Sequence, residues 1–449
     1  MAARLSRREF LVRTATLSGA VAGTAFLQAC AAPVAPAADG GEEMPMEAPV
    51  QLSLWRGTNG IWDDHFEAIA GYMADAGITP LVEIAQPHIP WSEWQDKVRI
   101  SAEAGVGPDL IFTINPLLTE QVKNNMILPA PLDLYSPEEI EKDFHETWLQ
   151  GVKFDGRYYN IPWDGGGFGL VCDVTNLKEA GVNELPNNFE EFVDAAQRVV
   201  TYDGDNLVKD GFGFFHASYL YGMLFSSIGG RRPGPEDTEL TFDNELGWHA
   251  WDLVLDYETE YDIFHWDFTK GISPDLCISA YTEGRGAFCV TNSAFSTGVE
   301  EQFGHETKTI SLKACIPEGE LQHPISAGWG LAVTSAAPPE NLDAAWKVWR
   351  FVATEEMCAR YQLATGFASG NRAVQALGTD GFTGPRASDM AQEVSDVMCC
   401  GYLRWDGIDQ PTYMHEHENV YTDMLHEGFS AEEAMARRGP DMLKGLLGS

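Results

Sequence analysis

Four consecutive residues near the C-terminus have side chains that could bind a metal ion: His415, Glu416, His417 and Glu418. Imidazole and carboxylate groups are metal ligands, but side chains that alternate along a helix point to different faces. This spacing would therefore not bring the two histidines onto one ion. We expect a solvent-exposed polar turn here and no metal site.

A glycine-rich run, Gly165-Gly166-Gly167-Phe168-Gly169, is a second candidate for chemistry. A phosphate-binding loop opens a helix, and in nucleotide-binding proteins it often carries a lysine. This run has neither feature. We expect it to act as a hinge or as a crossing of the backbone between two parts of the fold.

Motifs of covalent and metal-dependent catalysis are missing from the sequence. It contains no Gly-x-Ser-x-Gly elbow, no P-loop and no His-Glu-x-x-His pair. Carboxylates are so numerous, 67 among 449 residues, that no pair can be singled out for glycoside hydrolysis. These absences favour a binding protein without a cofactor over an enzyme.

The body of the chain alternates patterns typical of strands and helices. Residues 50–55 alternate apolar and polar side chains, as a strand does, and residues 66–73 carry apolar side chains at helical spacing. Strand, helix and strand patterns follow at 81–85, 91–104 and 109–114. This order predicts an α/β fold with a parallel sheet, in which ligands bind beyond the carboxyl ends of the strands.

Further helices are marked by their caps and their apolar stripes. Asn188 with Glu191 predicts the start of a helix over 189–200, and Ser430 with Glu433 predicts another near the C-terminus. A stripe over residues 342–352 predicts a third helix. It includes Trp346 and Trp349, for which we expect core packing.

The N-terminus carries the pattern of an export signal. Arg7-Arg8 precedes a short, mildly apolar stretch at residues 15–26, too short to span a bilayer, and Leu27-Gln28-Ala29-Cys30 resembles a bacterial lipobox. We expect residues 1–29 to be a twin-arginine signal peptide and Cys30 to be the lipidated residue. Residues 30–49, rich in Ala, Pro, Gly and Glu, would form a flexible tether to the membrane.

The charge and the cysteines narrow the partners. A formal net charge of −38 excludes a generic nucleic-acid binder and electrostatic docking on anionic lipid. Seven cysteines remain after Cys30, without a Cys-x-x-Cys pair, so they indicate neither a zinc site nor a full disulfide framework. Small buried hydrophobic residues are the favoured interpretation, with one disulfide among the five C-terminal cysteines as the alternative.

Seven blocks in order resemble the extracellular solute-binding protein family that includes maltose-binding protein and other sugar-importer receptors. The likeness runs over residues 50 to about 445 of the chain. Among the blocks are a Gly-x-Pro-Asp-hydrophobic segment and an Ala-Ala-Trp helix. The blocks are the strand ending at Trp55 and residues 104–112, 155–162, 185–192, 284–288, 328–333 and 344–351.

The resemblance implies a type II periplasmic-binding-protein fold of two α/β lobes with a ligand cleft between them. Lobe 1 would comprise residues 50–163 plus 329–368, and lobe 2 residues 164–328 plus 369–449. The implied activity is that of a monomeric, lipid-anchored extracytoplasmic receptor that is not an enzyme. It would deliver a mono- or oligosaccharide or a polyol to the permease subunits of an ABC transporter.

The resemblance also implies where ligand is held. Aromatic side chains would stack on the apolar face of a sugar and polar ones would bond its hydroxyl groups. The expected ligand contacts are Asn59, Gly60, Trp62, Thr113, Asn115, Trp163, Asp164, Phe295, Trp329, Trp405 and Asp406. Asp109 is expected to have a structural role.

One position departs from the family pattern. Where the family often has Gly-x-Trp at a cleft wall, this chain has Asn292-Ser293-Ala294-Phe295, so Ala294 stands at the tryptophan position. Phe295 would substitute from the next position. Two alternatives stay open: a surface lipoprotein hydrolase that uses cleft carboxylates, and a receptor for another ligand class, such as a polyamine or a peptide.

Overall fold

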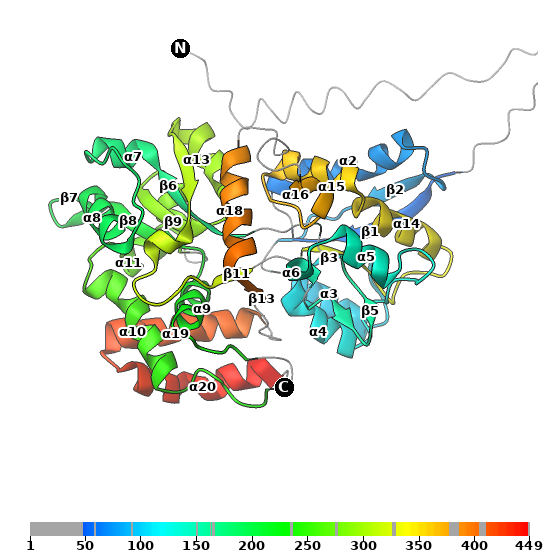
Figure 1. The fold of residues 1–449 in the computed structure, drawn as a ribbon. Coiled ribbons are helices and arrows are strands. Elements are labelled where there is room, and N and C mark those ends of the chain that lie inside the picture. Colours follow the sequence, from blue (N-terminus) through cyan, green and yellow to red (C-terminus); the bar gives the residue numbers. More distant parts are fainter. Residues whose placement is uncertain are drawn as a thin grey trace, which may run out of the picture. The chain divides into compact units, whose positions relative to one another are not determined.

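The computed structural model describes residues 48–449 except for 58–59, 91–92, 150, 162, 164–166, 234–236, 274–276, 326–328, 377–385, 404–409 and 448–449. The signal peptide, Cys30 and all but the last two residues of the predicted tether lie outside the described part. The described elements form two main sheets, each with its own helices and its own core (Figure 1). We call them lobe 1 and lobe 2.

Lobe 1 is built on a four-stranded sheet in the order β12-β3-β1-β2. Strand β1 pairs in parallel with β2 and with β3, so the predicted β-α-β-α-β arrangement is confirmed. Strand β12 arrives from much later in the chain and pairs antiparallel to β3, with Gly330 opposite Thr113. The strands are β1 (Val50–Trp55), β2 (Val82–Ala85), β3 (Leu110–Thr113) and β12 (Gly330–Val333).

Helices and a small hairpin complete lobe 1, and they include α16 (Arg372–Ala376), which packs against other helices of this lobe although its residues fall in the range expected for lobe 2. Two of the helices, α2 and α4, begin a few residues after the carboxyl ends of β1 and β3. The helices are α2 (Gly60–Asp75), α3 (Trp94–Glu103), α4 (Asn115–Lys123), α5 (Pro137–Asp143), α6 (Glu146–Leu149), α14 (Leu342–Val352), α15 (Glu355–Thr365) and α16 (Arg372–Ala376), and the hairpin is β4 (Lys153–Phe154) with β5 (Arg157–Tyr158).

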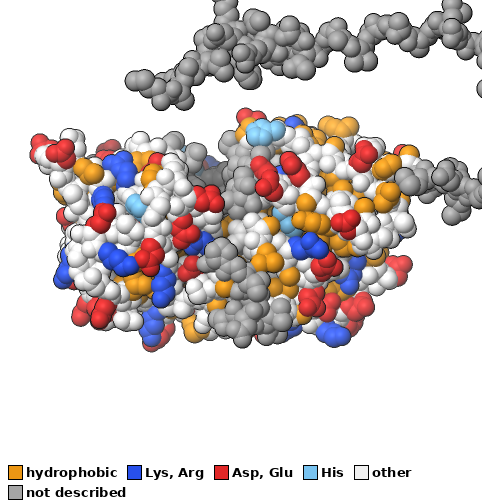
Figure 2. Space-filling view, turned by 90° about the horizontal axis from the view of Figure 1, so that it is seen from above, with side chains coloured by type: hydrophobic (Ala, Val, Ile, Leu, Met, Phe, Trp, Pro, Cys, Tyr) orange, Lys and Arg blue, Asp and Glu red, His pale blue; other side chains and the backbone are white. Residues whose placement is uncertain are grey.

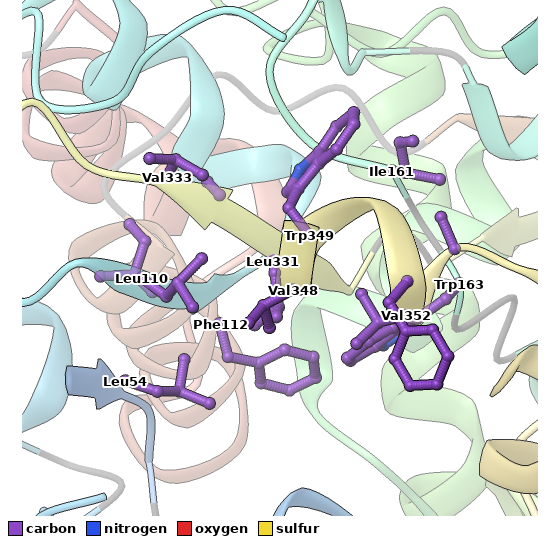
Figure 3. Close-up of a cluster of buried hydrophobic side chains, with 14 of the residues drawn as sticks. Leu54, Leu110, Phe112, Ile161, Trp163, Leu331, Val333, Val348, Trp349 and Val352 are labelled. Carbon is purple, nitrogen blue, oxygen red and sulfur yellow. The ribbon is translucent and has the colours of Figure 1, made fainter. Parts of the chain in front are cut away.

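The core of lobe 1 lies between the sheet and helix α14. Trp346 is 9% and Trp349 1% exposed, which confirms the predicted core packing of this helix. Complete burial of such a side chain contributes roughly 2–3 kcal/mol. Figure 3 shows strand and helix side chains meeting here: Leu54, Leu110, Phe112, Leu331 and Val333 from the strands, Val348, Trp349 and Val352 from α14, and Ile161 and Trp163 from the segment after β5.

Asp109 has the structural role expected from the sequence. Its Oδ2 accepts hydrogen bonds from the backbone N–H and the hydroxyl group of Ser53, at 2.7 and 2.9 Å. Its Oδ1 accepts a bond from the Asn341 amide at 2.8 Å. The carboxylate therefore joins β1, the start of β3 and the residue before α14.

Lobe 2 is built on a five-stranded mixed sheet in the order β10-β6-β9-β8-β7. Strand β8 is parallel to β9, whereas β6 is antiparallel to both β9 and β10. The strands are β6 (Gly169–Asp173), β7 (Thr201–Asp203), β8 (Asn206–Phe214), β9 (Gly286–Thr291) and β10 (Thr307–Ile310).

The helices of lobe 2 include the three C-terminal ones, α18 to α20. Helix α18 packs along β10, at the edge of the sheet (Figure 1). The helices are α7 (Val174–Glu179), α8 (Phe189–Val199), α9 (Ala217–Ser227), α10 (Glu245–Thr259), α11 (Trp266–Ile272), α12 (Ser279–Thr282), α13 (Ser296–Phe303), α18 (Ala387–Cys400), α19 (Gln410–Glu427) and α20 (Ala431–Leu447), with 3-10 turns η1 (Ser293–Phe295) and η2 (Leu312–Cys315). A separate parallel pair joins β11 (His323–Ile325) to β13 (Gly401–Leu403).

The capped helix starts are confirmed, one of them with a shifted partner. Asn188 accepts the backbone N–H of Glu191 at 2.9 Å, but the Glu191 carboxylate bonds back to the N–H of Asn187 and not to that of Asn188. Ser430 and Glu433 form the reciprocal pair as predicted.

The turn predicted at residues 415–418 is wrong, because these residues lie inside helix α19. His417 is completely buried and its Nδ1 donates to the Tyr413 carbonyl at 2.9 Å. Glu418 pairs with Lys270 at 2.5 Å and with His216 at 3.0 Å. Glu418 is thus held in the lobe by Lys270 and His216, which come from segments far away in the sequence. No group of three or more potential metal ligands occurs in the part of the chain that the structure describes.

The cysteines divide into two kinds. Cys399 and Cys400, at the end of α18, are joined by a disulfide. The other described cysteines are buried free thiols, as the favoured interpretation predicts, and they are Cys172, Cys277, Cys289, Cys315 and Cys358. None of the helices in the described ranges combines the length and the apolar character needed to cross a membrane.

Candidate ligand-binding site

The carboxyl ends of β1 and β3 place several of the expected contacts in lobe 1. Gly60 is the first residue of α2, and Asn115 is the first residue of α4. Parallel strands present their carboxyl ends at one edge of a sheet, and the helices that follow present their N-termini there. The backbone of this edge therefore matches the position expected for a ligand site.

Three of the expected tryptophans converge on a single ring, that of Phe112 in β3. The ring centroids of Trp62, Trp163 and Trp329 lie 5.3, 6.1 and 4.9 Å from that of Phe112. The tryptophans come from α2, from the segment between β5 and β6, and from the residue before β12. We call these four residues the lobe 1 aromatic cluster.

The members of this cluster differ in how much of their surface is accessible. Trp62 is 5% and Trp163 1% exposed, whereas Trp329 is only partly buried and stacks on Phe112 with 24° between the ring planes. A stacking platform needs an open face. Of the three indole-bearing residues, Trp329 keeps some exposed surface, whereas Trp62 and Trp163 are buried in the lobe.

Thr113 is placed at the same edge but is engaged within the lobe. Its side chain is fully buried, and its hydroxyl group donates to Oε1 of Gln121 at 3.0 Å. This bond ties the end of β3 to helix α4.

His65 is a residue of this region that the sequence reasoning missed. It lies on α2 three residues after Trp62, so the two side chains share a face of the helix. Its ring contacts Tyr361 and Trp163 edge-on, at 5.1 and 6.2 Å, and neither of its nitrogens has a hydrogen-bond partner among the described residues. Burial lowers the pKa of His65 to about 4.

Arg56, directly after β1, was also missed, although a charged residue at the end of an apolar strand is a signal for it. Its guanidinium group pairs with Asp63 at 2.6 Å, donates to Gln86 at 3.1 Å and lies 4.8 Å above the ring of Phe66. These contacts join the ends of β1 and β2 to the first turns of α2. Arg56 therefore fixes the start of the helix that carries Trp62.

Lobe 2 carries a second group of rings at the corresponding edge of its sheet. Phe215 follows β8, Phe295 follows β9, and Phe168 precedes β6, which runs antiparallel to β9. Tyr219 lies in the first turn of α9. Phe215 lies 5.4 Å from Phe168 and 6.0 Å from Phe295, and Phe168 lies 5.2 Å from Tyr219. We call these four residues the lobe 2 aromatic cluster.

Of this second cluster, only Phe295 was expected from the sequence. It is partly exposed, as is Phe215. The preceding residue of η1, Ala294, is 2% exposed and packs against the core of lobe 1. The residue at the position where the family often has tryptophan is therefore buried in this structure.

The remaining expected contacts cannot be placed. Asn59, Asp164, Trp405 and Asp406 lie outside the described residues, and so do Gly165 and Gly166 of the predicted hinge. Nothing is described of the side chain of Asn115.

Acidic side chains are scattered among basic, apolar and uncharged ones on the face that Figure 2 shows.

Comparison with known proteins identifies a family from the sequence, and it finds solved structures that share the fold. The sequence model of a family described as bacterial extracellular solute-binding protein matches residues 81–357. The maltotriose-binding protein of Pyrococcus abyssi is 25% identical over 301 residues, which is 64% of this chain and 59% of that protein. The chain thus spans about three fifths of the length of this relative.

Solved structures share the fold at low sequence identity. The GacH receptor of Streptomyces glaucescens, solved without ligand and with acarbose, has a TM-score of 0.70 at 18% identity, covering 90% of this chain and all of that one. The maltotriose-binding protein of Thermus thermophilus has 0.68 at 16%, covering 88% and 99%. An ABC substrate-binding protein of Listeria monocytogenes in complex with cycloalternan has 0.73 at 12%, covering 89% and 100%.

Proposed function

This chain belongs to the bacterial extracellular solute-binding proteins, and on that premise we propose that it binds a carbohydrate outside the cytoplasm and presents it to an ABC transporter. The observation that carries the proposal is the convergence of Trp62, Trp163 and Trp329 on Phe112. Three segments far apart in sequence bring their indoles to the edge where α/β sheets bind ligands.

The chemistry of the two aromatic clusters fits a sugar. A pyranose ring has an apolar C–H face that stacks on an aromatic ring, and its hydroxyl groups need polar partners at the rim. Trp329 in lobe 1 and Phe295 in lobe 2 are each only partly buried. A ligand that touches both lobes would favour a closed arrangement, and the permease would read that arrangement.

Short α-linked glucose oligosaccharides are the first ligands to test. The relative from P. abyssi is named for maltotriose, and the structure from T. thermophilus was solved with maltotriose bound. Both names support maltotriose as a probe for this chain. The departure at Ala294 and Phe295 favours a difference in ligand size from relatives that carry tryptophan at this wall.

The aromatic clusters favour a sugar over a cationic ligand. A polyamine receptor would need carboxylates beside its aromatic rings. Asp63, which directly follows Trp62 in the sequence, is paired with Arg56 at 2.6 Å and so is already engaged within the lobe. Hydrolysis remains the second candidate function, and analysis of maltotriose after prolonged incubation with the protein separates it from binding, since a receptor returns the sugar unchanged.

We further propose export by the twin-arginine route and anchoring through a lipid on Cys30, with residues 30–49 as the tether. The lipobox order Leu27-Gln28-Ala29-Cys30 supports the anchor. In a bacterial host, Cys30→Ala is expected to move the protein from the membrane fraction to the soluble extracytoplasmic fraction. Retention of the variant in the membrane fraction would contradict the anchor.

A thermal-shift titration tests the function itself. Maltotriose at a hundredfold excess over its Kd would stabilise the folded chain by about 2.7 kcal/mol. The expected result is a rise in Tm that increases with the logarithm of the maltotriose concentration above Kd and is absent with spermidine. No rise with maltotriose and with a panel of other sugars and polyols would overturn the proposal.

A further inference from the structure

Glu393 is a buried side chain in the middle of helix α18, and its carboxylate accepts hydrogen bonds from the turn η1 and the residue before it. It has no exposed surface. Its Oε1 accepts the backbone N–H of Ser293 at 2.5 Å, and its Oε2 accepts the side-chain amide of Asn292 at 3.2 Å. Both donors belong to the turn η1 and the residue that caps it.

Asn292 extends this contact to the segment that enters lobe 2. Its Nδ2 also donates to the carbonyl of Gly167 at 3.0 Å, and its Oδ1 accepts the N–H of Ala294 at 2.8 Å. Gly167 directly precedes Phe168, and Ala294 directly precedes Phe295. One continuous set of hydrogen bonds therefore runs from α18 to the residues that directly precede Phe168 and Phe295 of the lobe 2 aromatic cluster.

The rest of α18 is anchored by carboxylates that do not reach the cluster. Asp389 accepts the N–H of Thr309 at 2.7 Å and pairs with Arg386 at 3.1 Å. Asp396 accepts the N–H of Leu312 at 2.9 Å and the hydroxyl of Ser311 at 2.9 Å. These bonds fix the helix to β10 and η2. They leave Glu393 as the member of this carboxylate series that faces η1.

The packing around Glu393 is shaped to admit it. A side chain in place of Gly169, the first residue of β6, would lie 3.3 Å from Cγ of Glu393 and 2.2 Å from a methyl group of Thr309. Glycine at this position therefore leaves space for the Thr309 methyl group of β10 and for the Glu393 side chain of α18. Asp389 of α18 and Arg386, which directly precedes the helix, are charged groups that interact electrostatically with Glu393.

We propose that Glu393 is the positioning residue of the ligand wall in lobe 2. By fixing η1 and, through Asn292, residues 167–168, it holds Phe295 and Phe168 in the arrangement that meets the sugar. Glu393→Gln keeps one acceptor oxygen and replaces the other with an NH2 group, so either Ser293 or Asn292 loses its bond to α18 and the turn that carries Phe295 is held less firmly. The inference rests on the proposed function, since it assigns the residue to the sugar-binding wall.

The test compares Glu393→Gln with Asp396→Asn. Both variants turn a buried carboxylate of α18 that accepts a backbone N–H into the matching amide, but only the first contacts η1. We expect Glu393→Gln to weaken maltotriose binding about tenfold or more and Asp396→Asn to leave it within about twofold, at similar losses in Tm. Equal effects of the two variants on affinity would overturn the inference.

Hydrogen exchange gives a readout that does not depend on sugar binding. In Glu393→Gln the amides of residues 293–296 are expected to exchange faster, whereas Asp396→Asn accelerates residues 312–315 instead. Unchanged protection of residues 293–296 in Glu393→Gln would overturn the inference, whether or not the wild-type chain binds sugar. Absence of sugar binding in the wild-type chain would count against the proposed function alone.

Asn292→Ala supplies a second variant should Glu393→Gln fail to fold. It removes the link to Gly167 while the bond from Ser293 to Glu393 stays in place. The expected result is faster exchange at residues 167–170 with weaker maltotriose binding. Wild-type exchange at 167–170 together with wild-type affinity would contradict the role of this hydrogen-bonded path.

Discussion

Trp329 stacks on Phe112, with ring centroids 4.9 Å apart, although one residue precedes the late strand β12 and the other lies in β3. The antiparallel pairing of Gly330 with Thr113 brings them together. The partly buried Trp329 rests on a fully buried ring, which itself is packed against Trp62. As the proposed sugar platform, a ring supported in this way would be preorganised and would lose little side-chain entropy when ligand binds.

Replacement of this platform is expected to cost affinity and not folding. Trp329→Ala should weaken maltotriose binding roughly tenfold to a hundredfold, because it removes the stacked face, with a small change in the free energy of unfolding. The control is Trp349→Ala in the core, where truncation should cost about 3–5 kcal/mol of stability. Isothermal titration and urea unfolding of both variants measure the two quantities. Wild-type affinity in Trp329→Ala would mean that another aromatic forms the platform.

His65 predicts a loss of stability in acid. Its pKa is lowered to about 4 in the folded chain by burial, so the unfolded chain takes up a proton first as the pH falls. The contribution of neutral His65 to the free energy of unfolding is fully present above about pH 6.5. It is lost as the pH falls from about 6.5 to about 4, by as much as about 3 kcal/mol. Urea unfolding at pH 7.5, 5.5 and 4.5 should show a smaller decline in His65→Phe than in the wild-type chain. Parallel declines would contradict this assignment.

His265 predicts the opposite dependence. Burial alone would lower its pKa, but its bond and charge interaction with Asp210, at 3.0 Å, raise it. Burial also raises the pKa of Asp210. A group that binds its proton more tightly when folded stabilises the fold below its unfolded pKa and loses that effect as pH rises through the folded value. The stability difference between wild type and His265→Gln should therefore shrink from pH 6 to pH 8. A difference that grows over this range would contradict the pairing.

The cysteines predict a defined pattern of alkylation. Under native conditions without reductant, no thiol from Cys172 to Cys400 is expected to react, because five are buried and the remaining two are bonded to each other. Unfolding without reductant should expose the five, and reduction should add Cys399 and Cys400. Peptide mapping by mass spectrometry reads each site. Alkylation of Cys399 in the native, unreduced protein would show that this disulfide does not form.

Much of the fold could be predicted from local sequence patterns. The features that could not be predicted depend on pairing between segments that are far apart in the sequence. The arrangement of β1, β2 and β3 follows from the alternation of residues over one short stretch, so it could be predicted. The antiparallel docking of β12 and the approach of Tyr361 to His65 depend on contacts between distant segments, which periodicity does not report. The same limit explains the error at residues 415–418, where the partner of Glu418 is Lys270, 148 residues earlier.

Binding of maltotriose to the unmodified chain, measured by isothermal titration calorimetry, tests the central claim most directly. We expect one saturable site per chain with micromolar affinity, which corresponds to roughly −8 kcal/mol, and no consumption of the sugar. Heat that saturates with spermidine and not with maltotriose or any other sugar or polyol would contradict the assignment of a carbohydrate ligand.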